Sequence, residues 1–132
     1  MDLKKIIREI PDYPEKGILF RDISTIIDNP DAFEFSINRL VKMIEKRKPD
    51  YLAAIEARGF LFGAIVSHVT KIPLIMVRKK GKLPPPVITI DYDLEYGRDS
   101  LEVSASVMPK GKKFVVIDDI IATGGTVNAT CE

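Results

Sequence analysis

Three continuous apolar runs constrain the fold of this chain more than any other feature of its sequence. They are YLAAIEA (51–57), PLIMVRK (73–79) and KFVVIDDI (113–120), each seven or eight residues long. An uninterrupted apolar run of this length is typical of a strand buried on both faces of a parallel sheet. Because helical patterns accompany these runs, we predict an α/β fold with a mostly parallel sheet flanked by helices.

Three segments carry apolar residues at helical spacing. Residues 29–48 open with Asn-Pro, an N-cap followed by a first-turn proline, and end on basic residues, which predicts a helix. Residues 59–69 follow the first apolar run and are predicted to form a second helix. Residues 2–10 show the same spacing before Pro11, which predicts a short amphipathic helix there.

The other segments are predicted to be loops or exposed strands. Residues 11–24 contain two prolines and a glycine and are interpreted as an ordered loop with a short extended piece. Residues 79–100 contain three consecutive prolines and many charges, which favours a long flexible arm with some extended character. Residues 100–107 alternate apolar with polar side chains, the pattern of a half-exposed strand.

Size and charge limit the class of protein. A chain of 132 residues, 45% apolar and 30% charged, fits a single globular domain over 1–132. A formal charge of +1 gives no general attraction to nucleic acid or to an anionic membrane, so an anion site has to be local. The single cysteine, Cys131, and charges spread through residues 1–10 lead us to expect a cytoplasmic protein.

The third apolar run ends in two adjacent carboxylates, Asp118 and Asp119, and a loop of small residues follows. Ligands of open parallel sheets bind beyond the carboxyl ends of the strands. A carboxylate pair suits two sugar hydroxyls, and glycines let backbone N–H groups close around a phosphate. Either dipeptide alone fits a turn cap or a packing requirement. Together they predict a sugar-phosphate site.

The stretch VVIDDIIATGGT (115–126) resembles the phosphoribosyl-pyrophosphate motif of the type I phosphoribosyltransferases. Three further stretches resemble the adenine branch of that family: GILFRDIS (17–24), EARGFLFG (56–63), and RKKGKLP with DLEYG (78–84 and 93–97). They occur in family order over nearly the whole chain. The resemblance implies the type I phosphoribosyltransferase fold, with a hood-like segment over 1–27 and the flexible arm over 79–100.

The resemblance implies how the donor, 5-phosphoribosyl 1-pyrophosphate, is held. Asp118 and Asp119 would bind the ribose hydroxyls. The 5′-phosphate would be held by Ala122, Thr123, Gly124, Gly125 and Thr126. Arg58 and Gly59 would clasp the pyrophosphate; the alternative is that Arg58 caps a helix or pairs with Glu56.

A cationic patch follows the second apolar run. The resemblance implies that Arg78 and Lys82 bind the donor. A solvated basic turn is the alternative, mainly for Lys79 and Lys80. The resemblance also implies Mg²⁺ as cofactor, bridging the donor's own oxygens and reached by Asp118 and Asp119 only through water, with no direct protein ligand.

The resemblance further assigns residues to the base and to the reaction centre. Leu19, Phe20 and Arg21 would bind the base, although the first two also fit an ordinary core. Glu95 would be catalytic together with Arg58, with Tyr96 beside it in the arm. From the residues alone, Glu95 is an exposed arm glutamate.

The function implied is purine salvage: transfer of the 5-phosphoribosyl group to N9 of adenine, giving AMP and pyrophosphate, by a homodimer. The alternatives are a phosphoribosyltransferase for a 6-oxopurine (hypoxanthine, guanine or xanthine), a non-catalytic regulatory module that binds the donor, and an inert structural remnant.

Two departures from the family stand out. Family chains continue past the phosphate loop, whereas this sequence ends at Glu132, so we expect the usual C-terminal portion to be lacking. Ser104 stands where the adenine branch often has histidine, and no role is assigned to it.

Overall fold

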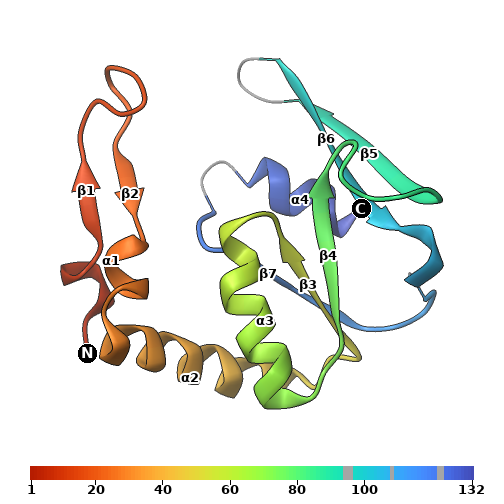
Figure 1. The fold of residues 1–132 in the computed structure, drawn as a ribbon, viewed down its shortest axis with the longest axis horizontal. Coiled ribbons are helices and arrows are strands. Elements are labelled where there is room, and N and C mark those ends of the chain that lie inside the picture. The colour runs from red at the N-terminus through yellow and green to blue at the C-terminus, as the bar shows by residue number, and fades with distance from the viewer. Residues whose placement is uncertain (94–96, 108, 122–123) are drawn as a thin grey trace. The chain divides into compact units, whose positions relative to one another are not determined.

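The computed structural model describes residues 1–93, 97–107, 109–121 and 124–132. The chain divides into two compact units, Met1–Met43 and Ile44–Glu132, and each is described by itself. Helix α2 (Pro30–Arg47) begins in the first unit and ends in the second (Figure 1). Among the described residues, no helix combines the length and the apolarity that crossing a bilayer requires.

The first unit begins with a β-hairpin. A 3₁₀ turn, η1 (Leu3–Lys5), precedes β1 (Arg8–Ile10), which pairs antiparallel with β2 (Phe20–Asp22). The predicted helix over 2–10 is therefore wrong. An isolated helix of this length is marginal in water, whereas pairing gives the backbone of β1 hydrogen-bond partners in β2.

Tertiary contacts fix this hairpin. Arg8 Nη2 lies 2.6 Å from Asp22 Oδ2, directly across the two strands. The rings of Tyr13 and Phe20 meet edge to face at 5.1 Å. The extended piece predicted within 11–24 is thus confirmed as β2, and a one-turn helix that the sequence patterns did not indicate, α1 (Ser24–Ile27), follows it.

The helix predicted over 29–48 is confirmed as α2. The Asn29 Oδ1 atom accepts a hydrogen bond from the Ala32 N–H at 3.1 Å, as an N-cap should, and Pro30 is the first helical residue. The helix ends at Arg47, and Lys48 adopts a left-handed conformation with φ of 50°.

In the described part of the second unit, five strands form one sheet in the order β5-β6-β4-β3-β7. The three predicted buried strands are confirmed as β3 (Tyr51–Ile55), β4 (Leu74–Lys79) and β7 (Phe114–Ile117), with β3 parallel to both neighbours. The sheet is mixed, because β6 (Arg98–Ser104) and β5 (Val87–Asp93) add on in antiparallel orientation.

Two helices cover opposite faces of this sheet (Figure 1). On β3, Ala54 faces α3 (Arg58–Thr70), where it meets Gly63. Its neighbours Ala53 and Ile55 point to the other face and join a cluster that includes Ala129 of α4 (Gly125–Cys131). This alternation explains why β3 carries apolar side chains on both faces.

The segment 79–100 contains more regular structure than predicted. Strands β5 and β6 pair from Val87↔Ser104 to Asp93↔Arg98, so most of the predicted arm is a β-hairpin. The half-exposed strand predicted over 100–107 begins earlier, at Arg98, and gives way to a 3₁₀ turn, η2 (Ala105–Val107). Alternating side chains in 87–93 are the signal for this hairpin.

The contact between α3 and β3 predicts a stability effect. A Cβ atom on Gly63 would lie 2.7 Å from Ala54 Cβ and 3.4 Å from Leu74 Cδ1. Gly63→Ala should destabilise the fold by about 1–3 kcal/mol in urea unfolding, because overpacking exceeds the gain of about 1 kcal/mol in helix propensity. The double variant Gly63→Ala/Ala54→Gly is the matched control. Additive effects of the two changes would contradict this contact.

Candidate functional site

The site lies where the carboxyl ends of three parallel strands meet. Glu56 to Gly59 follow β3, Arg78 to Lys82 end and follow β4, and the acidic pair follows β7. Helix α3 leaves β3 toward one face, whereas α4 lies on the opposite face after β7. The backbone therefore diverges between β3 and β7, and such a switch point opens a crevice at this edge.

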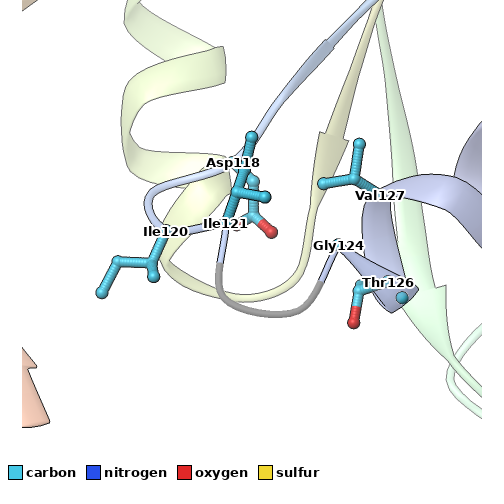
Figure 2. A pocket seen from close by; sticks show the side chains of 7 residues that line it. Asp118, Ile120, Ile121, Gly124, Thr126 and Val127 are labelled. Carbon is cyan, nitrogen blue, oxygen red and sulfur yellow. The ribbon is translucent and has the colours of Figure 1, made fainter. Parts of the chain in front are cut away.

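A pocket of about 100 Å³ lies between the end of β7 and the start of α4. Its lining residues are Asp118, Ile120, Ile121, Gly124, Gly125, Thr126 and Val127. Figure 2 shows the Asp118 carboxylate between the strand end and Gly124. Gly124 has φ of +87°, a left-handed conformation that disfavours any side chain. The structure thus brings together the acidic end of β7 and three of the five residues predicted to hold the 5′-phosphate.

The other two, Ala122 and Thr123, lie outside the described residues. Glu95 and Tyr96, predicted near the reaction centre, lie outside them as well. Leu19, Phe20 and Arg21 belong to the first unit. There, Leu19 is exposed, Phe20 packs on Tyr13, and Arg21 Nε lies 3.7 Å from Glu9 Oε1.

Arg58 pairs with the acidic pair across the crevice. Its Nε atom lies 2.8 Å from Asp119 Oδ2, and the Asp119 side chain is only 7% exposed. This is a charge contact without hydrogen-bond alignment, because Asp119 Oδ2 has no hydrogen-bond partner within the described residues. The alternative pairing of Arg58 with Glu56 is not the one adopted. An acceptor oxygen in this position can still take a hydrogen bond from a bound group.

Gly59 packs the start of α3 against the same carboxylates. A Cβ atom there would lie 3.1 Å from the Ile117 carbonyl oxygen and 3.2 Å from Asp118 Oδ1. A side chain at this position would need the end of β7 to shift by a few tenths of an ångström. The close approach of the α3 backbone to Asp118 therefore favours the glycine of the EARGF stretch.

The environment of Asp118 favours its protonated form. Burial is the largest cause, and the adjoining Asp119 carboxyl adds to it; together they raise the pKa of Asp118 to about 6, although Arg58 acts in the opposite direction. The Asp119 N–H also donates to Asp118 Oδ1 at 2.8 Å. Two carboxyls held this close are unfavourable by themselves and become favourable beside hydrogen-bond donors or cations.

Glu56 organises the cationic side, and we did not predict this role from the sequence. Its Oε1 accepts from the Lys79 N–H at 2.7 Å and lies 3.4 Å from Arg78 Nε, and its Oε2 accepts from Lys82 Nζ at 2.7 Å. Arg78 Nε is buried without a hydrogen-bond partner among the described residues. The available signal was one acidic residue within the apolar run 51–57.

Lys79 and Lys80, for which a solvated basic turn was the alternative, differ in their surroundings. Lys80 is exposed, as a solvated basic turn requires. Lys79 Nζ instead donates to Asp99 Oδ2 and, at 3.1 Å, to the Tyr92 hydroxyl, both in the β5–β6 hairpin. The Tyr92 hydroxyl lies 3.5 Å from Thr126 Oγ1, so this hairpin reaches the first turn of α4.

No group of three or more histidine, cysteine or acidic residues able to hold a metal ion occurs among the residues described. The two carboxylates beside the pocket fit water-mediated contact with a hard cation rather than direct ligation by a protein cage.

Comparison with known proteins finds one family that matches nearly the whole chain. The model of the phosphoribosyl transferase domain matches residues 23–132. Adenine phosphoribosyltransferase of Trichodesmium erythraeum is 49% identical over 132 residues, which is 100% of this chain and 78% of that protein.

Solved structures agree with this result. The crystal structure of adenine phosphoribosyltransferase from Thermoanaerobacter pseudethanolicus superimposes with a TM-score of 0.92 at 47% identity, covering 98% of this chain and 75% of that one. The Saccharomyces cerevisiae adenine phosphoribosyltransferase, complexed with an imino-altritol bisphosphate and adenine, gives a TM-score of 0.92 at 37% identity, covering 98% and 76%. The chain therefore belongs to the phosphoribosyl transferase domain family, within its adenine phosphoribosyltransferases.

Proposed function

We propose that this chain transfers the 5-phosphoribosyl group from 5-phosphoribosyl 1-pyrophosphate to N9 of adenine, giving AMP and pyrophosphate in purine salvage. The observation that carries the proposal is the pocket after β7, which Asp118 and the glycine turn line together. The ion pair of Arg58 with Asp119 lies at the same strand end, and Asp119 Oδ2 has no hydrogen-bond partner among the described residues. Sugar hydroxyls supply the missing donors, and a phosphate suits the glycine turn.

The ribose end of the donor lies at the end of β7 and the start of α4 in this proposal. Asp118 and Asp119 accept hydrogen bonds from the two ribose hydroxyls, each strengthened by the carboxylate charge. The backbone of the turn surrounds the 5′-phosphate, and the residues that form it are Ala122, Thr123, Gly124, Gly125 and Thr126. The pocket beside Asp118 supports this order of groups along β7 and α4.

The pyrophosphate lies toward β3 and β4 in the proposal. Arg58 and the backbone at Gly59 bind it from one side, and Arg78 and Lys82 from the other. As the bond from C1′ to the pyrophosphate oxygen breaks, negative charge grows on the leaving group and positive charge on the ribose ring. Fixed cations at the leaving group lower the barrier because they need no reorganisation at that moment.

The base completes the reaction. Leu19, Phe20 and Arg21 hold adenine, N9 forms the new bond to C1′, and the N9 proton leaves to a nearby carboxylate, for which Glu95 is the proposed acceptor. Tyr96 and the remainder of the arm keep water from the cationic ribose. These roles rest on the family motifs that the residues match.

Mg²⁺ is the proposed cofactor, bound through oxygens of the donor and reached by Asp118 and Asp119 through water. When bound, it neutralises phosphate charge. A homodimer and a cytoplasmic location stay predictions from the family and the sequence. Adenine is favoured over a 6-oxopurine because the relatives at 47–49% identity are adenine phosphoribosyltransferases.

The purified chain should form AMP and pyrophosphate from adenine and the donor only when Mg²⁺ is present. With hypoxanthine, guanine and xanthine as competitors, adenine should be the preferred base.

Asp119→Asn should weaken donor binding about 10- to 100-fold, because hydrogen bonds to a charged acceptor contribute about 1.5–3 kcal/mol. The exposed Asp31→Asn is the matched control. Donor binding without turnover of any purine would favour the regulatory module instead.

Asp118 should make the metal-free protein less stable as pH rises. Its folded pKa of about 6 exceeds the ordinary value of 3.8, so between these values the folded state binds more protons and the free energy of unfolding falls with pH. Asp118→Asn cannot ionise. Relative to wild type it should therefore gain about 1–3 kcal/mol, or several degrees in Tm, on going from pH 4.5 to 7.5.

The same variant should bind the donor poorly, since the amide lacks the carboxylate charge. Tm is measured by scanning calorimetry at both pH values, and Asp31→Asn again serves as the control. An equal effect of Asp118→Asn on Tm at both pH values would contradict the raised pKa.

A further inference from the structure

Glu56 is a buried carboxylate that the proposed reaction does not use directly. It follows β3 immediately, and its side chain is 8% exposed. Its backbone N–H donates to the Val77 carbonyl oxygen at 2.9 Å, which continues the pairing of β3 with β4 by one residue. The carboxylate is therefore placed by the sheet itself, at the edge where the site lies.

Both oxygens of this carboxylate serve the residues that end and follow β4. One lies near Arg78 Nε and accepts the Lys79 N–H, and the other accepts Lys82 Nζ. Burial raises the pKa of Glu56, but the hydrogen bonds from Lys82 and from the Lys79 N–H outweigh it and lower that pKa below its usual value. Glu56 thus stays ionised at neutral pH.

The cations that Glu56 holds still face solvent. The Lys82 side chain is 51% exposed, and the Arg78 guanidinium lies 5.8 Å from the centre of the Phe60 ring with part of its surface open. Each can therefore meet an anion on its outer side while the carboxylate fixes its inner side. Holding long side chains in place before binding removes the entropy cost of ordering them later.

A second buried carboxylate holds the same turn without contacting a cation in the described residues. Glu102, 6% exposed, accepts the Gly81 N–H at 2.6 Å and the Thr89 hydroxyl at 2.9 Å. Two carboxylates therefore anchor the backbone between β4 and β5, but only one of them also positions side-chain charge. The two can be compared directly.

We propose that Glu56 is a positioning residue for the pyrophosphate end of the donor, holding Arg78 and Lys82 in the arrangement that binds it. This inference rests on the proposed function. It has a selective consequence: the affinity for ligands that carry a pyrophosphate depends on Glu56, whereas the affinity for AMP, which has a 5′-phosphate only, does not.

The test is calorimetric binding of the donor with Mg²⁺, of pyrophosphate with Mg²⁺, and of AMP. Glu56→Gln keeps the shape and one acceptor but removes the charge. It should raise the Kd for the donor and for pyrophosphate about tenfold or more. Its Kd for AMP should change less than twofold. Glu102→Gln, the matched control, should change the ratio of donor Kd to AMP Kd less than twofold.

A second measurement separates the loss of the Glu56–Lys82 contact from a general loss of folding. In a double-mutant cycle with Lys82→Met, the effects of Glu56→Gln and Lys82→Met on donor Kd should be less than additive, because each breaks the same contact. Equal losses of affinity for AMP and for the donor would overturn the inference, and so would unchanged or tighter donor binding. If Glu56→Gln does not fold, Glu56→Asp takes its place in the cycle, and additive effects of Glu56→Asp and Lys82→Met on donor Kd would then overturn the inference. A wild-type chain that binds neither ligand would overturn the proposed function and this inference together.

Discussion

The ion pair between Arg58 and Asp119 is the contact on which the site depends. Strand β3 has parallel neighbours on both sides, and the helices after β3 and β7 lie on opposite faces. The backbone would leave an open crevice there, and the pair closes it at 2.8 Å. Since a buried carboxylate without a partner is strongly unfavourable, the first residue of α3 and the residue pair after β7 are held in register.

The carboxylates at this edge are satisfied to different degrees, and this separates their tasks. Glu56 has a backbone N–H and two cations as partners, so its surroundings are complete without a ligand. Asp119 has an oxygen with no hydrogen bond from the described residues, and Asp118 is disfavoured as an anion by its burial. The carboxylate on the cationic side thus has its partners within the chain, whereas the acidic side keeps an acceptor that the proposed donor would engage.

Much of the fold follows from local pattern, because β3, β4 and β7 are apolar on both faces and α2 has its own N-cap. The segment 2–10 was misjudged because helical spacing over nine residues cannot compete with antiparallel pairing to a strand ten residues further on. The role of Glu56 could not be predicted, because its partners lie at the end of β4 and in the turn after it. The partner of Arg58 was equally hidden: Glu56, two residues earlier, was the alternative by sequence, but Asp119 is the residue across the crevice.

The four cations of the basic patch differ in their partners. Lys79 contacts Asp99 and Tyr92 of the β5–β6 hairpin, and Lys80 is exposed. Arg78 and Lys82, the two proposed to bind the donor, both lie beside Glu56. The Tyr92 hydroxyl lies 3.4 Å from Asp99 Oδ2 and 3.5 Å from Thr126 Oγ1, and its single proton can serve one of them at a time. A phosphate that accepts from the Thr126 hydroxyl would therefore change the hydrogen bonding of Tyr92 and, through Asp99, of Lys79. The Tyr92 hydroxyl thus links the β5–β6 hairpin to the first turn of α4.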